Sequence, residues 1–145
     1  MLILNRTIIG SQFPEVAIPI IDHCKKSIDI IVYDWRWYAN DIGSSVQLFN
    51  QAIARASARG VAVRVITSCP VIITKLKNIG CEAKKLESKK LIHCKAMILD
   101  NKYLIIGSHN YTQSAFNINH ELSVLLENPD FLGDISAYFN NLWRL

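Results

Sequence analysis

Residues 93–110 read HCKAMILDNKYLIIGSHN, and the organisation of the chain can be worked out from this stretch. Two apolar runs, residues 93–100 and 102–108, are separated by an Asp-Asn step. Asp and Asn tolerate the left-handed backbone that a tight hairpin turn requires. The stretch therefore predicts two strands joined by a short turn.

The residues before this hairpin alternate between strand and helix patterns. Residues 28–34 are short, β-branched and apolar on both faces, as expected of a strand covered on both sides of a sheet. Helix patterns ending at Gly60 and Gly80 then alternate with strand patterns, which gives a strand-helix-strand-helix-strand order typical of α/β architecture. The segments are SVQLFNQAIARASARG at 45–60, VAVRVIT at 61–67, PVIITKLKNIG at 70–80 and CEAKKL at 81–86.

The two ends of the chain supply the remaining elements. Residues 1–10 read as a first strand, and apolar residues recur at helical spacing over residues 14–26. After the hairpin we expect a helical turn, a strand and a closing helix, at NYTQSAF, HELSVLLE and PDFLGDISAYFNNLWRL. We predict an α/β fold in which a mixed β-sheet is sandwiched between helices, in a single domain over residues 1–145.

Composition and charge indicate the expected compartment of the protein more than its function. The 16 basic and 12 acidic residues give a net charge of +4, which favours a polyanion but also suits ordinary solubility. No apolar run approaches the ~20 residues that span a bilayer, and no secretory leader is evident. The four cysteines lack zinc-site spacing, so we read them as reduced thiols and expect a cytoplasmic protein without stable membrane insertion. They are Cys24, Cys69, Cys81 and Cys94.

Two motifs within the hairpin indicate chemistry on phosphate. The first has the pattern H-x-K-x-x-x-x-D and the second the pattern G-S-x-N; their residues are His93, Lys95 and Asp100, followed by Gly107, Ser108 and Asn110. Residues two apart on a strand project from the same face, so one side chain can attack phosphorus while its neighbour holds the anion. A lysine charge, an asparagine amide and a serine hydroxyl all suit the non-bridging oxygens of a phosphoryl group.

The remaining motif residues read as structural. Asp100 lies five residues after Lys95, an odd separation that turns it to the other face of the strand. Gly107 is expected to permit a close backbone approach.

Both spacings match the signature of the phospholipase D superfamily, and the chain resembles a single-motif member. The resemblance implies a covalent phosphohistidine on His93 and a second histidine that protonates the leaving oxygen. Because the chain has one motif, it implies a homodimer with His93, Lys95 and Asn110 from each protomer in one shared site. It also implies that no metal or other cofactor is needed, and that Glu121 is the carboxylate that hydrogen-bonds the catalytic imidazole.

Other residues near these motifs are weaker candidates for a role in the site. Trp35, Arg36 and Trp37 could bind substrate by stacking on bases or lining a groove, although aromatics so spaced are more often core or dimer contacts. The lysines at 84, 85, 89 and 90 could follow a phosphate backbone or be a solvated surface. His23, His109 and His120 fall outside the signature.

The leading hypothesis is a metal-independent phosphodiesterase, most simply an endonuclease acting on DNA or RNA. A bell-shaped pH profile is expected, because one imidazole must be neutral while its mate is protonated. The alternatives are a lipid phosphodiesterase of the phospholipase D type and a catalytically idle subunit that binds nucleic acid.

Overall fold

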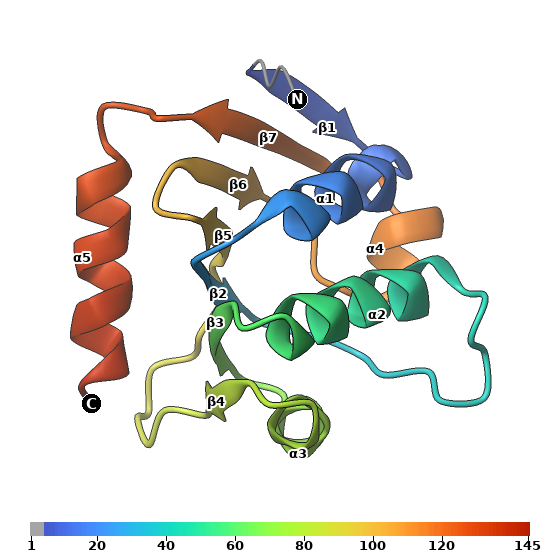
Figure 1. The fold of residues 1–145 in the computed structure, drawn as a ribbon, viewed down its shortest axis with the longest axis horizontal. Coiled ribbons are helices and arrows are strands. Elements are labelled where there is room, and N and C mark those ends of the chain that lie inside the picture. The colour runs from blue at the N-terminus through green and yellow to red at the C-terminus, as the bar shows by residue number, and fades with distance from the viewer. Residues whose placement is uncertain (1–4) are drawn as a thin grey trace.

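The computed structural model describes residues 5–145, and its centre is one mixed sheet of seven strands in the order β1-β7-β6-β5-β2-β3-β4 (Figure 1). Strands β2, β3 and β4 are parallel to one another, and the remaining pairings are antiparallel. The strands are β1 (Arg6–Ile9), β2 (Ser27–Val32), β3 (Ala62–Thr67), β4 (Glu82–Lys84), β5 (Lys95–Leu99), β6 (Tyr103–Gly107) and β7 (Leu122–Glu127). The first four residues of the expected N-terminal strand lie outside the described residues.

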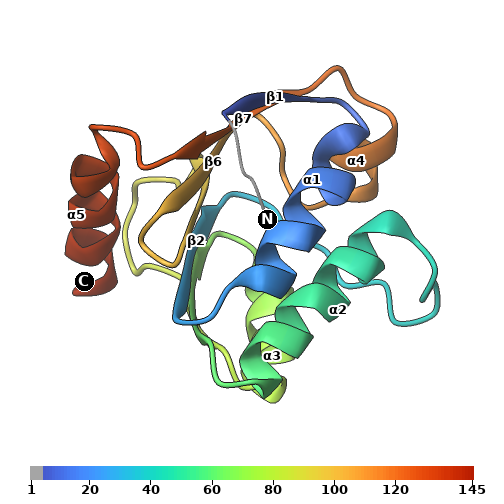
Figure 2. The same cartoon turned by 45° about the horizontal axis from the view of Figure 1, so that its top comes forward.

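Helices cover both faces of this sheet, as the sequence predicted. The helices α1, α2, α3 and α4 lie on one side and α5 lies alone on the other (Figure 2). Their bounds are α1 (Gln12–His23), α2 (Ser45–Ala58), α3 (Pro70–Asn78), α4 (Gln113–Asn117) and α5 (Leu132–Trp143). The predicted fold class is therefore confirmed.

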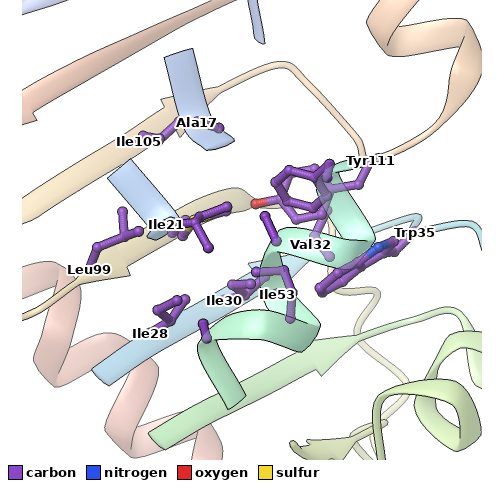
Figure 3. Packing of buried hydrophobic residues seen from close by; sticks show 14 of the residues in the cluster. Ala17, Ile21, Ile28, Ile30, Val32, Trp35, Ile53, Leu99, Ile105 and Tyr111 are labelled. Atoms are coloured by element: carbon purple, nitrogen blue, oxygen red, sulfur yellow. The ribbon is translucent and has the colours of Figure 1, made fainter. Parts of the chain in front are cut away.

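Each face of the sheet has its own apolar core. Alternate residues of β2, namely Ile28, Ile30 and Val32, are fully buried against the α1 and α2 side, where they meet Ile53 and Tyr111 (Figure 3). The opposite face packs against α5 through a smaller cluster that includes Ile31, Ile98 and Phe139. A strand with apolar residues at nearly every position is what a sheet covered on both faces requires.

One charged residue of β2 also faces α5. Asp29 is about nine-tenths buried, and its carboxylate accepts two hydrogen bonds of 2.9 Å from Arg64 on β3. The Arg64 guanidinium also donates to Asn140 and lies 4.9 Å from the centre of the Phe139 ring. The buried charge is thus paired, and the pair ties α5 to the sheet.

The turn between β5 and β6 has the expected left-handed backbone, with φ of 55° at Asp100 and 51° at Asn101. The Asp100 carboxylate accepts hydrogen bonds from the backbone N–H groups of Lys25, Lys26 and Ser27 and from the Cys24 thiol. Burial alone would raise the pKa of Asp100, but these hydrogen bonds together lower it. Asp100 therefore holds the chain between α1 and β2.

The same contacts explain why α1 is displaced from its predicted range of 14–26. The helix begins at Gln12 and ends at His23, because residues 24–27 turn to meet the Asp100 carboxylate. His93 also differs from expectation. It precedes β5, whose ladder begins at Lys95, so His93 and Lys95 do not lie on one strand.

Candidate active site

The strand register brings the signature residues to one edge of the sheet. Val32 at the carboxyl end of β2 pairs with Lys95 at the amino end of β5. Ala96 pairs with Ile106, so β6 ends beside Lys95, and Gly107 in turn pairs with Ser123 of β7. Residues that are far apart in the chain therefore meet here, including those on both sides of the hairpin.

His93 and Lys95 are neighbours in space as well as in sequence. The Lys95 Nζ lies 3.4 Å from the His93 Nδ1, and the His93 side chain is solvent-exposed. Tyr33, the residue after β2, packs its ring against the imidazole with 5.2 Å between the ring centres. The same ring lies 6.0 Å from the Lys95 ammonium. An imidazole and a cation thus contact the same aromatic ring. The sequence pattern did not identify Tyr33 as a site residue.

Asn110 is oriented by the backbone. The Asp34 N–H donates to its side-chain oxygen over 3.1 Å, which leaves the amide NH₂ group to point elsewhere as a donor. The segment is held in place by reciprocal backbone hydrogen bonds, from Tyr111 N–H to Asp34 and from Arg36 N–H to Tyr111. These bonds extend the sheet edge past β2 and set Asn110 beside it.

Ser108 and Glu121 form a hydrogen-bonded pair. The Ser108 hydroxyl donates to Glu121 Oε1 over 2.6 Å and accepts from the Leu122 N–H over 3.0 Å. Asn119 donates to the other Glu121 oxygen. Within residues 5–145 the expected hydrogen bond from the His93 imidazole to the Glu121 carboxylate is not formed. The Ser108 proton is directed to Glu121, so Ser108 could donate to a substrate only by giving up that bond.

Gly107 is required by the spacing of β6 and β7. A Cβ built at this position would overlap the Ser123 side chain and backbone and the Leu122 carbonyl oxygen. Only glycine lets the two strands approach this closely.

The structure corrects the expectation that Trp35 binds substrate. Its side chain is fully buried (Figure 3). Its indole N–H donates to the Asn50 side chain of α2 over 2.6 Å. Asn50 also donates to the Arg36 carbonyl, and Gln47 accepts from the Tyr38 N–H. Trp35 is therefore a core residue that pins the loop after β2 onto α2.

Trp37 and Arg36 have different surroundings. Trp37 is half-buried and packs against the main core, so a stacking role for it stays a prediction. Arg36 is exposed and pairs with Asp34 over 2.9 Å; this hydrogen-bonded carboxylate raises the pKa of Arg36. Arg36, Asp34 and Tyr33 line a pocket of about 310 Å³ with residues 68–71.

His109 is buried and has both ring nitrogens occupied. One nitrogen lies 2.7 Å from the Ser123 hydroxyl and the other 2.8 Å from the Gly10 carbonyl oxygen. Burial lowers the pKa of His109, so the ring is neutral, donating to Gly10 and accepting from Ser123. His109 joins the start of α1 to β7 and has no free nitrogen for chemistry.

The described residues offer neither a cluster of metal-binding side chains nor a membrane-spanning helix. Within residues 5–145, no three His, Cys, Asp or Glu side chains are grouped so that they could hold a metal ion. No helix in that range is long and apolar enough to cross a bilayer.

Relatives of known structure share this fold. NucT from Helicobacter pylori superposes with a TM-score of 0.79 at 18% identity, over 97% of this chain and 96% of that one. Nuc from Salmonella typhimurium, a phospholipase D family member, superposes with a TM-score of 0.77 at 23% identity, over 97% and 95% of the two chains.

Sequence comparison points the same way. The mouse mitochondrial cardiolipin hydrolase is 32% identical over 109 residues, 71% of this chain and 46% of that protein. The human protein of the same name is 27% identical over 126 residues, 83% of this chain and 46% of that protein. The chain thus spans just under half the length of these curated relatives. The family model described as "Cardiolipin synthase, PLD-like domain" matches residues 17–143, and the chain therefore belongs to the phospholipase D-like family.

Proposed function

We propose that this chain is a metal-independent phosphodiesterase that cleaves DNA or RNA through a covalent phosphohistidine on His93. The observation that carries the proposal is the exposed His93 beside Lys95 at one sheet edge, with the Asn110 amide oriented by the backbone of Asp34. An imidazole, an ammonium and an amide donor are what in-line displacement at a phosphodiester needs.

The chemistry requires a second histidine. In the first step one ring nitrogen of His93 bonds to phosphorus, the bond from phosphorus to the leaving oxygen breaks, and that oxygen takes a proton from an imidazolium. Water then attacks phosphorus, gives a proton to the second, now neutral imidazole, and releases His93. His109 cannot be the acid, because it is buried with both nitrogens bonded.

A homodimer supplies the missing acid as the His93 of a second copy. The two-fold axis would then pass near the exposed His93 and Lys95 side chains, and each protomer would contribute Lys95 and Asn110 to the phosphate oxygens. An anionic phosphate would also compete for the Lys95 ammonium, which faces His93 Nδ1 in the isolated chain. Glu121 accepts the Ser108 hydroxyl here and is the carboxylate that the family resemblance assigns to the site.

The names of similar proteins agree on the family but do not decide the substrate. Nuc is described as a phospholipase D family member, and the mouse and human relatives are named mitochondrial cardiolipin hydrolases. We favour nucleic acid, because the pocket beside His93 is lined by an aromatic ring, a guanidinium and a carboxylate, groups that suit a nucleotide better than an acyl chain.

A cleavage assay tests the reaction. The protein is incubated in EDTA with plasmid, single-stranded DNA, RNA, and vesicles of phosphatidylcholine or cardiolipin. We expect nucleic acid cleavage that His93→Ala lowers by about a thousandfold or more. His23→Ala changes the last residue of α1, which lies outside the signature motifs, so it serves as the matched control and should keep full activity. Equal cleavage by His93→Ala would contradict the mechanism. Cleavage of cardiolipin alone would show that the substrate is a lipid and not nucleic acid.

A subunit-mixing assay tests the shared site. After exchange between equal amounts of wild-type protein and His93→Ala, only wild-type homodimers would keep both histidines, so activity should fall to about a quarter of the unmixed wild-type value. Independent sites would instead leave about half. Light scattering should report a dimer, and a fully active monomer would refute the shared site.

A further inference from the structure

A second, strongly basic pocket lies next to the site. It has a volume of about 220 Å³ and is lined by Lys85, Lys89 and Lys90 together with residues 67–68, 86, 88 and 91–92. Ile92, which contributes to its wall, directly precedes His93. Ser68 lines both this pocket and the one that contains Tyr33 and Arg36, so the two hollows are adjacent.

The loop that carries these lysines is attached to the sheet. The Ser68 hydroxyl, just beyond β3, donates to the Ile92 carbonyl over 3.2 Å. The Ser88 hydroxyl accepts from the Lys90 N–H over 3.1 Å, which shapes the loop from within. The pocket is thus joined to the same sheet edge that positions Tyr33 and His93.

The pocket has three cations and no carboxylate in its wall. The ion pairs formed within residues 5–145 use other cations, namely Arg36, Arg55, Arg64 and Lys102. Glu87 lies in the same loop but is not among the lining residues. Lys84 is different from its neighbours, since it donates to the Trp143 carbonyl and lies 5.1 Å from that indole ring. The run of lysines therefore divides into one residue that contacts α5 and three exposed residues that line a hollow.

We propose that this lysine pocket is a second phosphate subsite, which holds the phosphodiester adjacent to the scissile one in a polynucleotide strand. The inference rests on the proposed function, because it takes the phosphate at His93 as the one that is cleaved. A strand bound across both hollows places one phosphate by His93, a base or sugar against Tyr33 and the next phosphate among the lysines. A small diester with a single phosphate cannot reach the second subsite.

The test compares substrates with and without a neighbouring phosphate. Lys89→Gln/Lys90→Gln should lower kcat/KM on a single-stranded oligonucleotide by about tenfold, mainly through KM, since the two exposed charged contacts together contribute about a factor of ten. The slope of log(kcat/KM) against log salt concentration should become less negative by about 1.4 in this variant. Hydrolysis of bis(p-nitrophenyl) phosphate should stay within about twofold of wild type.

Lys25→Gln/Lys26→Gln is the matched control, because it removes the same charge from exposed residues that precede β2 at the opposite edge of the sheet. This control should leave the hydrolysis of both substrates at the wild-type rate. Equal losses on both substrates, equal losses in the control, or no loss on the oligonucleotide would each overturn the subsite.

A binding measurement keeps the subsite testable without turnover. Fluorescence anisotropy of a labelled oligonucleotide is recorded with His93→Ala and with the same protein carrying the two lysine changes. Affinity should fall about tenfold. If wild-type protein cleaves nothing but this loss is seen, the proposed reaction fails and the phosphate subsite stands. If the lysine changes weaken binding only to cardiolipin vesicles, the subsite belongs to a lipid and the inference fails.

Discussion

Replacing Asp100 by Asn tests whether the aspartate of the H-x-K-x-x-x-x-D motif stabilises the fold without taking part in the reaction. The change keeps the shape of the side chain and suits the left-handed backbone at this position, where φ is 55°. It removes the negative charge and one acceptor oxygen, and the new NH₂ group faces backbone donors.

The cost follows from the bonds that are lost. Oδ1 accepts from Lys26 N–H over 2.7 Å and from the Cys24 thiol over 3.0 Å, and Oδ2 accepts from Lys25 N–H over 3.0 Å. Hydrogen bonds to a charged group contribute about 1.5–3 kcal/mol each, and the Asn oxygen retains part of them. We expect the free energy of unfolding to fall by about 2–3 kcal/mol.

The effect should depend on pH in a defined direction. The folded-state pKa of Asp100 is below its ordinary value of 3.8, so its stabilisation is complete above pH 3.8 and disappears as the pH falls through the lower folded value. Urea denaturation at neutral and acidic pH measures the difference between wild type and Asp100→Asn. Asp41→Asn, an exposed loop residue, is the control.

Two results would refute this reasoning. A loss below about 0.5 kcal/mol at neutral pH would show that the carboxylate is not needed to hold residues 24–27. A loss of kcat in fully folded Asp100→Asn protein would give Asp100 a part in the reaction, which its position at the edge of the sheet opposite His93 excludes.

Three further predictions concern stability. Asn50→Leu should cost about 2–3 kcal/mol in urea denaturation, because it leaves the buried Trp35 indole N–H and the Arg36 carbonyl without partners; no loss would contradict the pinned loop. Gly107→Ala should cost about 3 kcal/mol, since its Cβ overlaps Ser123, while Gly133→Ala, where nothing lies near the new methyl group, should stay within about 1 kcal/mol. Burial lowers the pKa of His109, so the stability that it contributes should be complete above the ordinary value of 6.5 and fall as the pH drops below it. His109→Gln should be less stable, and its free energy of unfolding should change less with pH over this range. An equal pH dependence in both proteins would contradict a buried, neutral His109.

Local patterns were enough to predict the elements and the type of sheet. Apolar residues on both faces of β2 required cover on both sides, and α1 to α4 and α5 supply it. The Asp-Asn step predicted the turn that joins β5 and β6, including its left-handed backbone. These features depend on residues close together in the chain, where spacing carries the information.

The surroundings of the site depend on register, which the sequence does not display. Tyr33 lies beside His93 only because β2 pairs with β5, two strands separated by more than sixty residues in the chain. The spacing of Trp35 favoured a core or dimer contact but left a substrate contact open, because its partner Asn50 lies on the next helix. The motif gave the residues of the candidate site, and long-range pairing gave their neighbours.

The position of His93 just outside β5 has a consequence for motion during a reaction. Lys95 is fixed by the ladder, whereas His93 lies on the connecting segment that ends there. Backbone torsions in such a segment change without altering strand pairing, and its amides exchange with deuterated water sooner than those of a ladder. Under the proposed mechanism, a phosphorylated imidazole would therefore shift by bond rotation alone, while the Lys95 cation that is proposed to hold the phosphate would stay fixed to the sheet.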